Sequence, residues 1–216
     1  IASCLVGSEM CIRDRYEAGR LLTSGAGNTI MGYRAARSAT DSVTGAVAIG
    51  YDAMYSSTDS AGNIAIGYFA LRGGSGGSSR DYNIAIGQDA MRDANPHISV
   101  AIGYTAGQFL KDGAVGAIHV GHETGRFASG SGNVFMGYNA GKGGTTSAPY
   151  STGTNNVAIG QQALTAFTTG GSNTAIGYQA GHLISSGSNN TVMGYQAGYS
   201  LGCLLYTSPS PRDKRQ

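Results

Sequence analysis

The sequence contains no tryptophan and no uninterrupted apolar stretch approaching the roughly 18 residues that a membrane-spanning helix needs. Bulky aliphatic residues arrive in ones and twos, whereas glycine alone supplies 36 positions. Because ordering the backbone costs roughly 1 to 2 kcal/mol per residue, segments with so little apolar area must bury surface against their neighbours. We therefore expect repeats or oligomers, and no membrane insertion by this segment.

Cysteine and net charge are also missing from the middle of the chain. The three cysteines, Cys4, Cys11 and Cys203, all lie in residues 1–15 and 203–216, so residues 16–202 can form neither a disulfide framework nor a cysteine metal site. The same two ends hold five of the 14 basic and three of the 12 acidic residues, which leaves nine of each between them. A neutral segment without basic clusters predicts no nucleic-acid partner.

The two ends lack the motif that fills the rest of the chain, and the first residue is not methionine. Residues 8–15 and 204–213 resemble peptides that arise when sequencing-adapter DNA is translated. We therefore interpret residues 1–15 and 203–216 as non-native or disordered tails that add no coil, and the chain as a fragment. Genuine disordered tails are the alternative.

Residues 16–202 contain ten copies of a short motif centred on a glycine. Asparagine stands four positions before the glycine in seven copies, Ile, Met or Val stands directly before it in all ten, Tyr follows it in seven, and Ala stands three positions after it in nine, with Thr124 as the exception. Successive glycines are 16 to 23 residues apart. The ten are Gly32, Gly50, Gly67, Gly87, Gly103, Gly121, Gly137, Gly160, Gly177 and Gly194.

The motif predicts an all-β fold, a parallel β-solenoid of about ten coils of 16–23 residues. A central glycine and the lack of a 3.6-residue period argue against helices, whereas alternation around the glycine fits a short strand. We expect the residues three and one before the glycine to point into the coil, namely Val47 and Ile49, Ile64 and Ile66, Ile84 and Ile86, Val100 and Ile102, and Val157 and Ile159. The Ala and Gly columns would then face outward, and the mostly polar column two after the glycine would face water, with variable loops at one corner.

Three copies, Val47-Ala-Ile-Gly50, Val100-Ala-Ile-Gly103 and Asn156-Val-Ala-Ile-Gly160, resemble the head repeats of YadA-like trimeric autotransporter adhesins. The resemblance covers residues 28 to about 201, and related repeats occur in phage tail fibres. It implies a left-handed β-roll, three chains around one axis, export to the cell surface and adhesion to a protein or glycan receptor. The recurrent tyrosine and the variable period depart from the adhesin pattern.

Few residues suggest chemistry. His119, His122 and Glu123 form the only short cluster of possible metal ligands, but they lack a third or fourth fixed ligand, and the odd spacing of the histidines favours opposite faces. Gly137–Lys142 has neither Walker nor Rossmann spacing. We therefore predict no catalytic, cofactor-binding or metal-binding residue, no cofactor and no enzymatic activity.

The tyrosine column (Tyr33, Tyr51, Tyr68, Tyr104, Tyr138, Tyr178, Tyr195) is either an exposed binding row or a buried ladder, and alternation with the inward Ile favours the ladder. We expect an extracellular, non-enzymatic attachment module of a bacterial adhesin or virion tail fibre. The expected homotrimer has a seam containing Ala48, Ala65, Ala85, Ala101, Ala158 and Ala175. The alternatives are a ligand-binding solenoid such as an ice-binding protein, or a carbohydrate-active enzyme on a β-helix.

Overall fold

The computed structural model describes residues 12–14, 16–22, 25–39, 43–56, 61–73, 80–111, 114–144, 147 and 150–200, with the first of these ranges described by its backbone only. Of the expected tails, residues 1–11, 15 and 203–216 lie outside these ranges, as do residues 201–202 and residues 74–79 of a glycine-rich loop. The described residues contain strands and turns but no helix.

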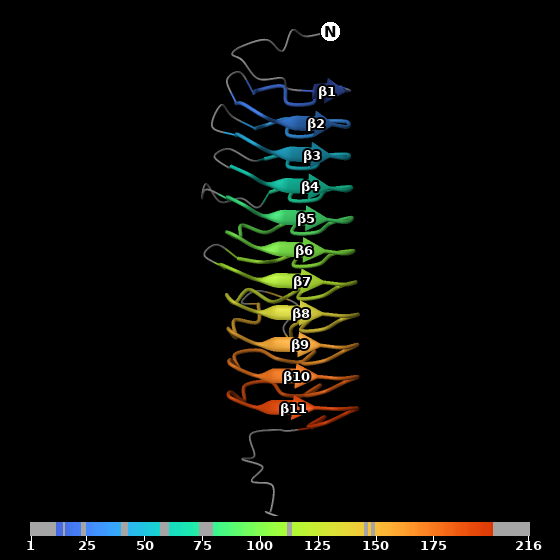
Figure 1. Ribbon diagram of the computed structural model, residues 1–216, viewed down its shortest axis with the longest axis vertical. Coiled ribbons are helices and arrows are strands. Elements are labelled where there is room, and N and C mark those ends of the chain that lie inside the picture. The colour runs from blue at the N-terminus through green and yellow to red at the C-terminus, as the bar shows by residue number, and fades with distance from the viewer. Residues whose placement is uncertain are drawn as a thin grey trace, which may run out of the picture.

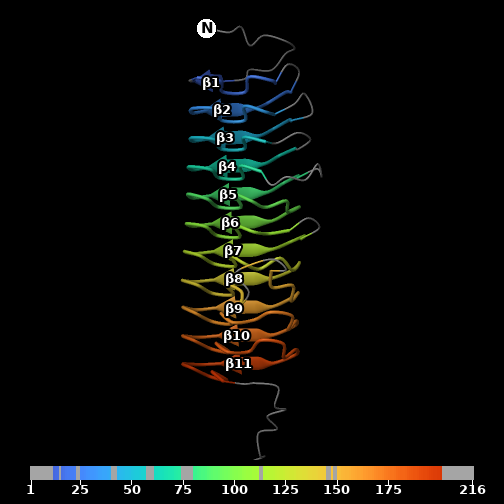
Figure 2. The same ribbon diagram turned by 180° about the vertical axis from the view of Figure 1, so that it is seen from behind.

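The chain forms an all-β parallel solenoid of about nine turns, which confirms the predicted fold class; the repeats had indicated about ten coils. Its strands stack in chain order in a single column, and the connections wrap behind them (Figures 1 and 2). Every strand has three residues: β1 (Ile12–Asp14), β2 (Thr29–Met31), β3 (Val47–Ile49), β4 (Ile64–Ile66), β5 (Ile84–Ile86), β6 (Val100–Ile102), β7 (Ile118–Val120), β8 (Val134–Met136), β9 (Val157–Ile159), β10 (Thr174–Ile176) and β11 (Thr191–Met193).

All ten strand pairs are parallel, and the nine from β2–β3 to β10–β11 keep the register that the glycine alignment predicted. In β3 and β4, for example, Val47 pairs with Ile64 and Ala48 with Ala65. Strand β1 continues this ladder onto β2. The backbone of Ile12–Asp14 thus joins the strand column, although these residues lie within the expected tail and lack the motif.

A glycine ends each strand from β2 to β11 because the backbone there turns in a way that other residues rarely adopt. Gly67 has φ of +134°, and the other glycines of this column have φ between +122° and +136°. A Cβ atom on Gly67 would also lie 2.6 Å from the carbonyl oxygen of Gly87 in the next coil. Strained backbone and close stacking together explain why the column is invariant in this chain.

The structure reverses the predicted assignment of strand faces. In strands β2 to β11 the middle residue points inward: Ala48, Ala65, Ala85, Ala101, Ala158 and Ala175 are all fully buried. The residues on either side of it, expected inside, are only partly buried or exposed. Alternation was predicted correctly, but its phase was wrong. The reason is that residues after the glycine also enter the coil and leave room for one small strand side chain.

The residue four positions after the glycine occupies that shared interior. Where the strand contributes alanine, this residue is often large and buried, as in Met54, Leu71, Met91 and Leu164. Where the strand contributes His119 or Phe135, it is Gly125 or Gly141, and a Cβ on either glycine would collide with the ring. These coils therefore fill a thin core with a large side chain drawn from one of the two columns. The coils of β6 and β10 have alanine and glycine at these positions, and Leu110 and Ile184, seven residues after the glycine, are buried there instead.

Candidate functional site: the outer faces of the solenoid

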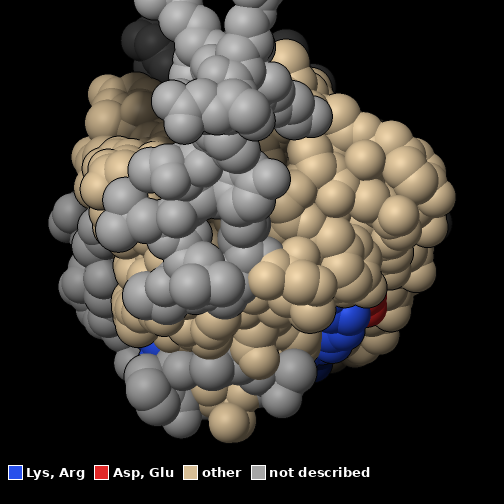
Figure 3. Space-filling view, turned by 90° about the horizontal axis from the view of Figure 1, so that it is seen from below, with Lys and Arg blue, Asp and Glu red and all other residues tan. Residues whose placement is uncertain are grey.

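The outward face of strands β2 to β11 consists of two columns of Val, Ile, Met and Thr, and no strand in this series contains Lys, Arg, Asp or Glu. Several of these side chains are 36% to 68% exposed: Met31, Ile102, Ile118, Met136, Ile159 and Met193. A continuous uncharged apolar face of this length is unusual on an isolated soluble molecule and indicates an interaction surface. Seen along the rod, charged side chains occupy little of the visible described surface (Figure 3).

The predicted trimer seam does not exist in its proposed form. Ala48, Ala65, Ala85, Ala101, Ala158 and Ala175 have no exposed surface, because their methyl groups point into the coil. A seam made by these alanines would require the coil to open. The exposed part of the strand face is formed by the aliphatic columns that flank them.

The tyrosine column lies beyond the glycine bend and forms three stacks. The first contains Tyr16, Tyr33, Tyr51 and Tyr68, whose neighbouring ring centroids are 5.0 to 5.3 Å apart with planes 14° to 20° from parallel. In the second, His122 lies between Tyr104 and Tyr138. The third pairs Tyr178 with Tyr195 at 5.3 Å.

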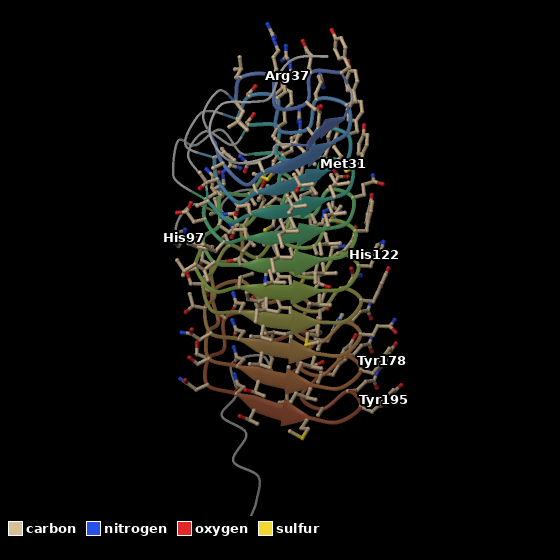
Figure 4. The ribbon with its side chains drawn as sticks, turned by 45° about the horizontal axis from the view of Figure 1, so that its top comes forward. Met31, Arg37, His97, His122, Tyr178 and Tyr195 are labelled. Carbon is tan, nitrogen blue, oxygen red and sulfur yellow. The ribbon has the colours of Figure 1, made fainter. Side chains whose placement is uncertain are left out.

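These tyrosines stack as a ladder, but the ladder is not buried. Their exposed fractions run from 38% to 75%, and Figure 4 shows His122, Tyr178 and Tyr195 on one edge of the rod. The prediction of a buried ladder is therefore wrong, because the glycine bend breaks the alternation that would have carried the ring inward. Gln88 and Gln161, both exposed, occupy the same column and separate the stacks.

The column two after the glycine, expected to face water, is partly buried. The side chain of Asp52 has no exposed surface and accepts two hydrogen bonds from Arg34, of 2.9 and 2.6 Å. The hydrogen bond to Asp52 raises the pKa of Arg34. Asp52 and its counterparts have positive φ, and Arg34 holds the same position as Asp52 in the preceding coil.

Glu123 in the same column joins two coils through cations. Its carboxylate contacts Lys142 at 2.6 Å and Arg126 at 2.7 Å. Burial raises the pKa of Glu123, but the hydrogen bond and charge of Lys142, with those of Arg126, outweigh burial and lower the pKa overall. The Lys142 ammonium group is therefore held by the Glu123 carboxylate. Position 141 needs glycine because a Cβ there would collide with the Phe135 ring. The Gly137–Lys142 stretch is therefore part of the coil.

The two histidines of the candidate metal cluster point to opposite sides, as their spacing predicted. His119 is fully buried, and burial lowers its pKa to about 3. Neither of its ring nitrogens has a hydrogen-bond partner. His122 is exposed between two tyrosines. Within the described residues no group of three or more His, Cys, Asp or Glu side chains could hold a metal ion.

The asparagine column has a structural role that the repeat alignment did not reveal. Asn83 is fully buried, accepts a hydrogen bond from the backbone N–H of Ser99 and donates one to the carbonyl of Pro96. Asn156 similarly accepts from the backbone N–H of Asn173 and donates to Gly170. The column thus supplies partners for buried backbone groups at the corner before each strand. The regular asparagine four residues before glycine was the available signal.

Comparison with known proteins yields no matching family model, no similar curated protein and no similar solved structure. The parallel β-solenoid is therefore established by the fold itself, while the adhesin-like or tail-fibre-like family stays a prediction. Across the described residues, no helix is long and apolar enough to cross a membrane. The features that could act on other molecules are the aliphatic strand face and the tyrosine edge.

Proposed function

We propose that this chain is a rod module of an extracellular attachment fibre, either adhesin-like or tail-fibre-like, and that it works without catalysis. The observation that carries the proposal is the uncharged aliphatic face running along strands β2 to β11. A rod with such a face has the form of a structural subunit, and its binding function would be presented along its remaining sides. The resemblance of its repeats to those of adhesin heads supports the same function.

The occupant of the aliphatic face is proposed to be further copies of this chain, assembled as a homotrimer. The face repeats with the strand spacing of about 4.8 Å, so a second rod with the same repeat can match it along its whole length. It carries no charge that association would have to desolvate. The seam therefore consists of the outward Val, Ile and Met side chains rather than the buried alanines.

Sedimentation of the full chain tests the assembly. We expect trimers, and we expect the double variant Ile102→Lys with Ile159→Lys to sediment as folded monomers, because lysine at outward strand positions must remain solvated. The matched control is Gln88→Lys with Gln161→Lys, which places the same charges on the tyrosine edge and should leave trimers intact. A wild-type chain that is monomeric over the whole accessible concentration range excludes this assembly.

Attachment is tested separately by measuring binding of the labelled full chain to intact bacterial and animal cells. Saturable binding that protease or periodate treatment of the cells removes supports a protein or a glycan receptor, respectively. Absence of saturable binding to any cell type, with trimers present, rejects the attachment function while leaving the structural role.

A further inference from the structure

The tyrosine edge places phenol rings of successive coils in contact without burying them. Tyr33 and Tyr51 are 5.0 Å apart between ring centroids with planes 15° from parallel, and each is 39% exposed. Tyr178 and Tyr195 show the same geometry at the other end of the rod. Because the planes are nearly parallel and the ring centroids are 5.0 to 5.3 Å apart, a small rotation of the two side chains would bring the carbons ortho to their hydroxyls together.

The column also contains its own interruptions. His122 separates Tyr104 from Tyr138, and Gln88 separates Tyr68 from Tyr104. Tyrosines on either side of such a residue are two coils apart, about 10 Å at the usual strand spacing. Reactions that require ring contact can therefore occur within the stacks and not across the interruptions.

We propose that the tyrosine stacks are sites of oxidative dityrosine cross-linking that joins successive coils covalently. The oxidant is hydrogen peroxide acting through a peroxidase. Each of two phenols loses one electron and one proton to give a phenoxyl radical. The radicals couple through their ortho carbons, and the hydrogen on each coupling carbon is replaced on the oxygen through solvent, which restores both phenols. One peroxide accepts the two electrons and two protons and becomes two waters.

Within the solenoid, each such bond closes a loop of one coil without changing the strand register. Tyr33 and Tyr51 belong to the coils of the paired strands β2 and β3, so their bond reinforces a contact that the backbone already makes. Covalent closure of loops restricts the unfolded chain, as disulfides do in other proteins. The repeat region has no cysteine to provide that alternative.

Treatment of the full chain with peroxidase and hydrogen peroxide, followed by peptide mass spectrometry, tests the proposal. We expect dityrosine fluorescence and the loss of two hydrogens per link. Links should join Tyr16 to Tyr33, Tyr33 to Tyr51, Tyr51 to Tyr68 and Tyr178 to Tyr195. No link should join Tyr104 to Tyr138.

Two sets of variants separate this geometry from nonselective oxidation. His122→Tyr completes the middle stack and should add links from position 122 to Tyr104 and Tyr138. Tyr33→Phe with Tyr51→Phe should remove the links of the first stack. The control Tyr82→Phe with Tyr150→Phe, at positions outside the column, should change nothing. Links mapping mainly to Tyr82 or Tyr150, links only between molecules, or no gain from His122→Tyr would each overturn the proposal.

Discussion

The imidazole of His119 stacks on the ring of Phe135 in the next coil, with centroids 5.1 Å apart and planes 8° from parallel. Both rings are fully buried, and the nitrogens of His119 lack partners. A histidine in this setting behaves as an aromatic core residue as long as it remains neutral. This pairing makes the solenoid sensitive to pH at one defined coil.

Acid should destabilise the fold through His119. The folded pKa is about 3 and the ordinary value is 6.5, so between these values the unfolded chain binds a proton that the folded chain excludes. The free energy of unfolding should fall by about 1.4 kcal/mol for each pH unit below 6.5 and level off below about pH 3. Urea unfolding at pH 7, 6, 5 and 4 measures this slope.

The variant His119→Phe should remove that component of the slope, because Phe135 shows that the interior accommodates a phenyl ring in the neighbouring coil. His182→Gln, at a half-exposed position, serves as the control and should keep the slope. An unchanged slope in His119→Phe would mean that other groups carry the acid sensitivity.

A large interior side chain should be movable from the middle position of a strand to the position four residues after the glycine. Phe135→Ala alone should destabilise by about 3 to 5 kcal/mol because it leaves a cavity. Adding Gly141→Leu should recover a large part of that loss, since Ala158 and Leu164 form this combination in the next coil, and Leu164 adopts φ of +50°, close to the +53° of Gly141. Chemical denaturation of the two variants and of Gly141→Leu alone completes the cycle. Additive effects of the two substitutions would contradict the shared interior.

Alanine should not be tolerated in place of a glycine at a strand end. It should be tolerated better at a glycine whose Cβ position has no neighbouring atoms. Gly67→Ala combines an unfavourable φ of +134° with a clash against Gly87, and we expect a loss of more than about 3 kcal/mol or failure to fold. Gly116→Ala is the matched control: its φ is +69°, and a Cβ there meets nothing within 4 Å. It should lose only about 1 to 2 kcal/mol. Thermal melting ranks the two, and equal losses would contradict the role of stacking.

Removing a buried asparagine from the column four residues before the glycine should destabilise the fold through its lost hydrogen bonds. Asn83→Ala leaves the N–H of Ser99 and the carbonyl of Pro96 without their side-chain partner, which should destabilise by about 1 to 3 kcal/mol. Asn190→Ala, at a partly exposed position in the coil of β11, should have a smaller effect because water can replace the lost bonds. The opposite ranking in urea unfolding would rule out this role.

The repeat alignment predicted strand position, parallel pairing and register because these follow from the spacing of one residue type. The inward face could not be read from alternation alone. Hydrophobicity favours putting Ile49 inside and Ala48 outside, but the coil is too thin to hold branched side chains from the strand together with residues such as Met54. The available signal was that a large residue at the middle strand position is paired with a small one four residues after the glycine. It is clearest where His119 and Phe135 accompany Gly125 and Gly141.

The tyrosine column shows a different limit. Its occurrence at the same position in seven of the ten copies predicted stacking, since parallel in-register strands bring equivalent side chains together. Its exposure depends on the backbone turn at residues such as Gly32 and Gly50, whose φ values do not follow from a pattern of side chains. The burial of Asp52 depends on the same turn and was missed for the same reason.

The ladder hydrogen bonds of this solenoid run parallel to its long axis, from each strand to the next (Figure 1). Mechanical tension applied between the two ends would therefore load those bonds in line, and the end coils would peel away first, one repeat at a time. Each of the described strands contacts only its sequence neighbours, so release of one coil leaves the remainder intact. Such a rod lengthens under load in small steps and rewinds from the surviving coils, which suits an element that must absorb sudden pulls.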